Sequence, residues 1–118
     1  MKVSVVVCTY TMDRYDDFAE AVDSVLRQTY DPIEIVLVSD GNAEVADRMS
    51  EDFGHFDSVR VHCTDENRGI SYSRTRGAEL ATGDLVAFLD DDAIAIHDWI
   101  ETLVETYEST DAYAVGGR

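Results

Sequence analysis

Three adjacent carboxylates, Asp90-Asp91-Asp92, directly follow the most continuously apolar segment of the chain, residues 85–89. At a strand end these groups would be partly desolvated and would repel one another. A divalent cation would relieve that repulsion, because Mg²⁺ and Mn²⁺ take oxygen ligands and commonly use one or two carboxylates plus phosphate oxygens. The other interpretation is a solvated acidic turn with an Asp capping the next helix. The position after an apolar strand favours a metal.

Two other apolar segments also end in residues that could bind a ligand. Asp40 begins the turn Asp40-Gly41-Asn42, where its carboxylate could accept hydrogen bonds from a ribose hydroxyl or a base N–H. A turn or helix-capping role explains this residue equally well. Thr9 and Tyr10 end the first apolar segment, and the Tyr10 ring could stack on a base. Alone, an aromatic residue at a strand end is weak evidence, because many such residues belong to cores.

Three of the nine basic residues fall within one segment, as Arg68, Arg74 and Arg76. Arginine binds phosphate in a bidentate geometry, so this segment could contact a phosphorylated ligand. For Arg68 and Arg76, salt bridges on a helix surface are an equally good explanation. The histidines share no spacing with another ligand type, so they indicate neither a metal site nor a general base; they are His55, His62 and His97.

Apolar segments alternate with amphipathic ones, which predicts repeated β-α units. Strands are predicted at residues 3–8, 33–39, 58–64 and 85–89, and residues 112–115 could begin a fifth. Helices are predicted at residues 16–28, 43–53, 70–81 and 97–107. Asp31-Pro32 is expected to end the first helix, because proline cannot continue one. The third strand is less apolar and is expected at the sheet edge. The fourth is expected to be covered on both faces.

Strands that alternate with crossover helices predict a mostly parallel sheet with helices on both faces, a Rossmann-like α/β fold. With the strand order 3-2-1-4, the switch in order falls between the first and fourth strands. Ligands bind outside the carboxyl ends of the strands near such a switch. The polar residues that follow the first, second and fourth strands are therefore expected to form one site.

The 118 residues are expected to form one domain, with 25 acidic and nine basic residues and a formal net charge of −16. Such a surface would repel nucleic acid and anionic lipid. The acidic residues are spread along the chain, which is typical of a protein from a salt-rich cytosol, where screening weakens self-repulsion. An ordinary acidic protein is the alternative.

Neither a signal sequence nor a membrane span is predicted. Met1 leads directly into a strand, and no apolar run approaches the roughly 18 residues of a spanning helix. A cytoplasmic protein is expected. Cys8 and Cys63 would lie two strands apart, roughly 9–10 Å, beyond the roughly 7 Å limit for Cα atoms joined by a disulfide. Both are expected to be free thiols.

Taken in order, these segments resemble the family 2 glycosyltransferases, an inverting group with the GT-A fold. The similarity extends over nearly the whole chain at the family's usual spacings, and the ordered set is more specific than any one segment. The matching stretches are residues 3–10, 24–30, 34–42, 67–69, 73–77 and 81–92.

The resemblance implies a nucleoside-diphosphate sugar donor of the UDP or GDP type, with Mn²⁺ or Mg²⁺ as cofactor. It implies that Thr9, Tyr10 and Asp40 contact the base and ribose, and that Arg74 lies near the phosphates or the sugar. In the D-x-D motif, Asp91 would face ribose or sugar, Asp92 would bind the metal, and Asp90 would share either task.

This sequence departs from the family pattern in the donor-binding segments. Ser39 replaces the first acid of the strand-two motif, and Cys8 stands where proline is frequent. The stretch Thr11-Met12-Asp13-Arg14 replaces the usual Asn-Arg, with extra residues. The base of the donor is therefore left open by the resemblance.

The implied reaction is attack of an acceptor hydroxyl on the anomeric carbon, with inversion and metal assistance. The family's catalytic base is an acid beyond the fifth strand, so no catalytic base is expected within residues 1–118 and these residues alone are expected to transfer sugar weakly or not at all. The acceptor is not indicated. Membrane contact is expected only through segments outside this sequence or through a lipid-linked acceptor.

Three other functions are alternatives to a glycosyltransferase. A sugar-nucleotide nucleotidyltransferase needs a glycine-rich basic loop after the first strand, and residues 9–14 contain no glycine. A phospho-acceptor signalling module needs a lysine near the last strand, whereas the single lysine is Lys2. A non-catalytic nucleotide-binding fragment would keep the same pocket residues, so the sequence leaves that alternative open.

Overall fold

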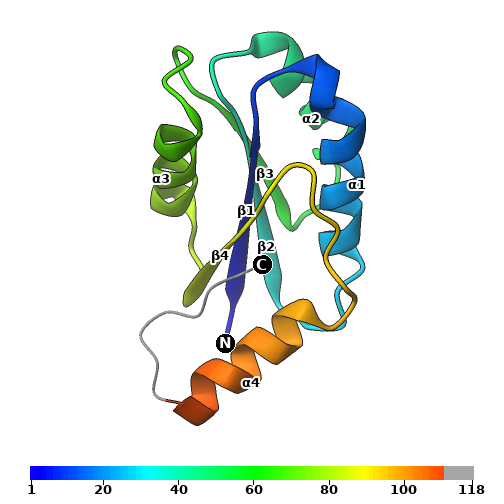
Figure 1. Cartoon of the computed structure of the whole chain (residues 1–118), viewed down its shortest axis with the longest axis vertical. Coiled ribbons are helices and arrows are strands. Elements are labelled where there is room, and N and C mark those ends of the chain that lie inside the picture. Colours follow the sequence, from blue (N-terminus) through cyan, green and yellow to red (C-terminus); the bar gives the residue numbers. More distant parts are fainter. Residues whose placement is uncertain (111–118) are drawn as a thin grey trace.

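The computed structural model describes residues 1–110, in which parallel strands alternate with helices (Figure 1). The strands are β1 (Val3–Thr9), β2 (Ile33–Ser39), β3 (Val59–Cys63) and β4 (Leu85–Leu89). The helices are α1 (Tyr15–Leu26), α2 (Ala43–Phe53), α3 (Ile70–Leu80) and α4 (Trp99–Thr110), and a short 3₁₀ helix, η1 (Met12–Arg14), precedes α1. The predicted fifth strand lies outside the described residues.

The four strands form one parallel sheet in the order β3-β2-β1-β4, as predicted. In this register Val3 lies between Ile33 of β2 and Leu85 of β4. Each connection carries a helix across the sheet, which is the connection that parallel strands require. The carboxyl ends of all four strands therefore point toward the same end of the sheet.

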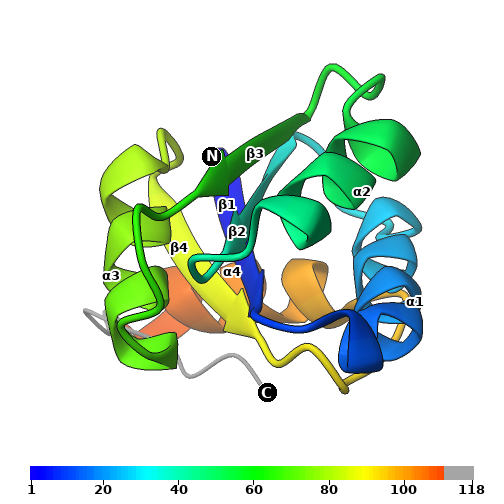
Figure 2. The same cartoon turned by 90° about the horizontal axis from the view of Figure 1, so that it is seen from above.

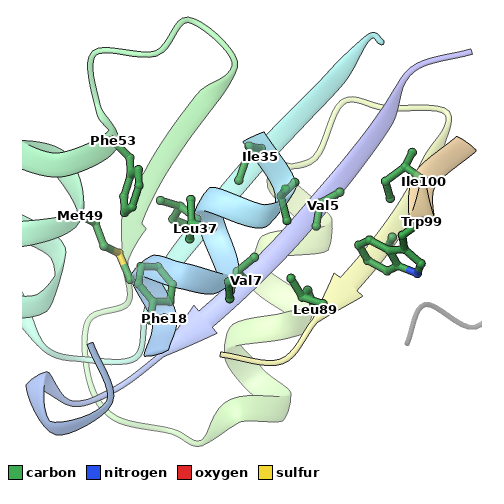
Figure 3. Close-up of a cluster of buried hydrophobic side chains, with 14 of the residues drawn as sticks. Val5, Val7, Phe18, Ile35, Leu37, Met49, Phe53, Leu89, Trp99 and Ile100 are labelled. Atoms are coloured by element: carbon green, nitrogen blue, oxygen red, sulfur yellow. The ribbon is translucent and has the colours of Figure 1, made fainter. Parts of the chain in front are cut away.

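The central strand β1 is buried on both faces, because helices cover each side (Figure 2). Alternate residues of a strand point to opposite faces. Val5 and Val7 pack, with Leu37 of β2, in the larger core formed with α1, α2 and α4 (Figure 3). Val6 and Cys8 belong to the smaller core on the other face, which α3 covers. The predicted α/β fold with helices on both faces is confirmed.

Close approach of α3 to the sheet depends on Gly77. A Cβ atom at this position would lie 2.5 Å from Cγ1 of Val6, closer than atoms can pack. Glycine therefore lets the helix backbone rest directly on β1. This contact fixes the height of α3 above the sheet, and with it the position of Arg74 one turn earlier.

Helix α1 ends at Leu26, two residues before the predicted end at residue 28. Just beyond it, Gln28 binds the segment that leads into α4, donating to Ile96 O at 2.7 Å and accepting from Ile100 N at 2.9 Å. One expectation about the elements is wrong. Strand β4 is not covered on both faces, since Val86 is 37% exposed. The reason is that α3 packs mainly over β1 and β2, and β4 is an edge strand of the described sheet.

The remaining boundaries agree with the predicted ones to within a few residues. Within residues 1–110, no helix combines the length and the apolar character that crossing a bilayer requires.

Candidate functional site

The site is formed by the segments that follow β1, β2 and β4, on the side of the molecule where η1 and the amino end of α3 also lie (Figures 1 and 2). Thr9 is the last residue of β1, Asp40 follows β2, and the acidic triplet follows β4. Because β1 lies between β2 and β4, residues at its carboxyl end can reach both neighbours.

Asp91 is the most enclosed of the three adjacent carboxylates. Its side chain is 11% exposed, and its Oδ2 accepts a hydrogen bond of 2.9 Å from the hydroxyl of Thr9, which is fully buried. Its other oxygen, Oδ1, lies 3.5 Å from the guanidinium of Arg14. Asp91 is thus oriented by two residues of the β1–α1 region.

The other two aspartates each face a different arginine. Oδ2 of Asp92 lies 3.5 Å from the same guanidinium nitrogen of Arg14. Oδ1 of Asp90 accepts a hydrogen bond of 2.6 Å from Arg74 of α3. The structure therefore brings Arg74 to the acidic triplet and adds Arg14, which the sequence left without a role. Whether Arg74 also lies near the donor's phosphates or sugar, as the resemblance implies, stays a prediction.

Tyr10 lies beside this cluster with 45% of its surface exposed. Its backbone carbonyl accepts a hydrogen bond of 3.2 Å from Asn42. The charge of Asp91 and then the side chain of Tyr10 raise the pKa of Arg14 above its usual value. Arg14 therefore feels both the aromatic side chain and the carboxylates.

Asp40 is 2% exposed, and both of its oxygens bind backbone N–H groups. Oδ1 accepts from Arg68 at 3.0 Å and Oδ2 accepts from Gly69 at 2.9 Å. The next residue, Gly41, has a φ of +70°, and a Cβ there would lie 2.3 Å from the backbone N of Asn67. Asp40 and Gly41 thus fix the β3–α3 loop against the β2–α2 turn.

Cys8 lies where these groups converge. The pKa of its thiol is raised to about 12, mainly by burial. The nearby charge of Arg74 opposes this rise in pKa, and the charges of Asp40 and Asp91 add to it. Cys8 and Cys63 are both free, as predicted.

The other candidate arginines bind neighbouring acids on the surface. Arg68 pairs with Glu66 at 2.8 Å and stacks on Tyr72, and Arg76 pairs with Glu79 at 3.2 Å. These contacts favour the salt-bridge interpretation for both residues.

Arg14 could not be placed from the sequence, because its position depends on the η1 turn. Thr11 begins this turn by accepting a hydrogen bond of 3.2 Å from Asp13 N. The sequence signal for this turn was a threonine just after the first strand with an aspartate two residues later.

Asp91 and Asp92 fit a divalent cation, although within residues 1–110 no three His, Cys, Asp or Glu side chains converge as a ready set of ligands. The resemblance implies a different pair, Asp92 with Asp90, and turns Asp91 toward ribose or sugar. In the structure, Asp90 pairs instead with Arg74. The carboxylates of Asp91 and Asp92 face a single positive group, so a cation at that place would meet two anionic oxygens. Two carboxylates completed by phosphate oxygens are the usual Mg²⁺ arrangement in nucleotide sites.

Comparison with known proteins identifies the family of the chain. A family model described as Glycosyl transferase family 2 matches residues 4–118. The chain is 68% identical over 118 residues to a glucosyl-dolichyl phosphate glucuronosyltransferase of Haloferax volcanii, covering 99% of this chain and 38% of that protein. The chain thus spans well under half of this relative's length.

Two solved structures share the fold. TarS 1-349 of S. aureus superposes with a TM-score of 0.79 at 23% identity, over 94% of this chain and 33% of that one. The mannosyltransferase PcManGT of Pyrobaculum calidifontis, in complex with GDP-Man and Mn²⁺, gives a TM-score of 0.75 at 24% identity, over 92% and 32%.

The strand order and these structural neighbours define a GT-A-type glycosyltransferase fold. The chain belongs to glycosyl transferase family 2.

Proposed function

We propose that this chain is the donor-binding part of an enzyme that transfers a sugar from a nucleoside diphosphate to an acceptor hydroxyl with the help of a divalent cation. The observation that carries the proposal is the meeting of Asp91 and Asp92 with Thr9 and Arg14 at the carboxyl ends of β1 and β4. Beside them, Arg74 pairs with Asp90. Family membership supports the reaction class.

Different residues of the site would bind the cation, the phosphates or sugar, and the base of the donor. Asp91 and Asp92 would hold Mn²⁺ or Mg²⁺, which when bound would offset the negative charge that grows on the leaving diphosphate. Arg74 would bind a phosphate oxygen or the sugar while Asp90 orients it at 2.6 Å. Tyr10 would offer its exposed ring to the base, beside a turn that Asp40 and Gly41 hold in place.

We propose a nucleoside diphosphate glucuronic acid as donor and a lipid-linked sugar as acceptor. The support is the 68% identity to a glucosyl-dolichyl phosphate glucuronosyltransferase, which extends over the whole part of the chain that contains the donor-binding residues. A uronic acid adds a carboxylate to the diphosphate charge, and arginine is the side chain best suited to bind both groups. The base that deprotonates the acceptor would lie in the remaining part of the enzyme.

The acidic composition supports a further proposal, that the protein works in a salt-rich cytosol. With a net charge of −16, the folded chain would repel itself strongly at low ionic strength.

Calorimetry with UDP, GDP, UDP-glucuronic acid, UDP-glucose and GDP-mannose, each with and without Mn²⁺, tests the donor proposal. We expect binding of UDP-glucuronic acid that requires Mn²⁺ and is lost in Asp92→Ala. Asp57→Ala is the matched control, because it removes the same charge from an exposed turn before β3, at the opposite end of the sheet.

Metal-independent binding, or equal loss in the two variants, would contradict the proposed site. Equal binding of UDP-glucose and UDP-glucuronic acid would contradict the proposed sugar and leave the site intact.

A further inference from the structure

Arg14 forms ion pairs with two of the three adjacent aspartates. Within residues 1–110, it is the sole ion-pair partner of both Asp91 and Asp92, and one guanidinium nitrogen lies 3.5 Å from an oxygen of each. Arg74, the other arginine at the site, pairs with Asp90. Arg14 therefore neutralises the two carboxylates that fit the cation, whereas Arg74 does not contact them.

The backbone that carries Arg14 is held, but its side chain is free to leave. Hydrogen bonds to Thr11 fix the η1 turn, through Asp13 N at 3.2 Å and Arg14 N at 3.4 Å. The side chains of Arg14 and Asp92 are 42% and 57% exposed. Exposed ion pairs contribute little to stability, so breaking the contact with Asp92 costs little. Asp91 is only 11% exposed, but it keeps its hydrogen bond from Thr9 when Arg14 leaves.

A divalent cation and Arg14 would compete for the same oxygens. A guanidinium that stays near Asp91 and Asp92 also repels an incoming dication, because like charges at short range repel even near a protein surface. Cation binding therefore requires that the guanidinium move off. A diphosphate that arrives with the cation gives arginine a new anionic partner and gives the cation further oxygen ligands.

We propose that Arg14 couples cation binding to donor binding: it bridges Asp91 and Asp92 until a nucleoside diphosphate arrives, and then releases them to the cation and turns to the diphosphate. The proposal rests on the proposed function, in which these two aspartates hold the cation. It makes Arg14 a positioning residue that weakens binding of the cation alone and strengthens the dependence of cation binding on nucleotide.

The test is titration of Mn²⁺ followed by electron paramagnetic resonance of the free ion, in KCl at which the chain is folded. Arg14→Gln is expected to bind Mn²⁺ about three- to tenfold more tightly than the wild type without nucleotide. With saturating UDP or GDP, the gain in Mn²⁺ affinity due to nucleotide is expected to be smaller in Arg14→Gln by about the same factor, since the coupling is reciprocal.

Two further variants separate the role of Arg14 from that of overall charge. Arg27→Gln removes the same charge just after the end of α1, where the Arg27 side chain is 75% exposed and pairs with Asp23. This variant is expected to bind Mn²⁺ as the wild type does. Arg14→Lys keeps the positive charge and is expected to stay within about twofold of the wild type.

Each other outcome is decisive. Equal Mn²⁺ affinity in Arg14→Gln and wild type without nucleotide would overturn the coupling role while leaving the proposed function standing. An equal gain of Mn²⁺ affinity in Arg27→Gln would assign the effect to net charge and would also overturn the coupling role of Arg14. If the wild type binds no Mn²⁺ even with nucleotide, both the proposed function and this inference fail.

Discussion

The hydroxyl of Thr9 donates a hydrogen bond of 2.9 Å to Oδ2 of Asp91, and this bond joins the carboxyl end of β1 to that of β4. The donor is buried in the central strand, whereas the acceptor stands at the start of a loop. The strand order makes the contact, because β1 and β4 are neighbours in space although 82 residues separate Thr9 from Asp91. A rigid strand therefore sets the direction of a carboxylate that would hold the cation.

Thr9→Val is expected to weaken Mn²⁺-dependent binding of UDP or GDP about ten- to a hundredfold, the usual value of one hydrogen bond to a charged group. Valine has nearly the shape of threonine but cannot donate, so Asp91 loses one of the two groups that orient it. Calorimetry measures the change. Thr9→Ser keeps a donor and is the control. If serine and valine weaken binding equally, the hydroxyl is not the cause.

Glu34 lies near the start of β2, at the end of the sheet opposite the site. Its contacts lead us to expect that the chain loses stability in acid. This side chain accepts hydrogen bonds from the Ser4 hydroxyl at 2.7 Å and from Thr82 N at 2.9 Å. Burial by itself would raise the pKa of Glu34, but these bonds, one from the Thr82 hydroxyl and the charge of Lys2 outweigh it and hold the pKa below its usual value.

Because the folded pKa lies below the unfolded value of about 4.3, ionised Glu34 stabilises the fold above that pH. The contribution is lost as pH falls through the folded pKa. Glu34→Gln is expected to lower the free energy of unfolding by about 1–2 kcal/mol at pH 7, because an amide offers one acceptor oxygen in place of two. The difference from the wild type should shrink below about pH 4 in urea titrations.

Glu79→Gln is the control for the acid effect. Glu79 is an exposed residue of α3 that pairs with Arg76 within one helix turn, a contact of little value. A constant difference between Glu34→Gln and wild type from pH 7 to pH 3 would contradict a depressed pKa for Glu34.

Salt is expected to stabilise the chain. With a net charge of −16, repulsion between surface carboxylates falls as the Debye length shortens from about 10 Å at 0.1 M to about 3 Å at 1 M. The unfolding midpoint temperature in KCl should rise by about 5 °C or more over this range, which corresponds to about 1 kcal/mol for a domain of this size. A midpoint that stays level or falls would contradict the proposal of a salt-rich cytosol.

The sheet could be predicted from sequence because its signals are local. Apolar runs separated by amphipathic segments gave strands β1 to β4 to within two residues at each end, and the parallel order follows from the crossover helices. The end of α1 was likewise predicted to within two residues. The hydrogen bonds that Gln28 makes with Ile96 and Ile100 were not predicted, because no local pattern encodes such distant contacts.

The acidic triplet was found for the same local reason, since it directly follows an apolar strand. Asp40 was found in the same way, because it directly follows β2, but its contacts were not. The position of Arg14 was not predictable in this way. The side chain of Arg14 reaches the triplet only through the η1 turn, and the sequence does not show that both Asp40 oxygens bind the β3–α3 loop. Whether Asp40 also contacts the donor's base, as the resemblance implies, stays a prediction.

The central claim is that Asp91 and Asp92 hold the cation. The most direct test uses NMR of the isotope-labelled chain with UDP or GDP to map which backbone amide signals Mn²⁺ broadens. We predict the strongest broadening at Thr9, Arg14 and Asp90–Asp92, with Asp57 and Ser58 at the other end of the sheet nearly unaffected. Broadening that is spread over the acidic surface, or centred away from Asp91 and Asp92, would contradict a cation site at the carboxyl ends of β1 and β4.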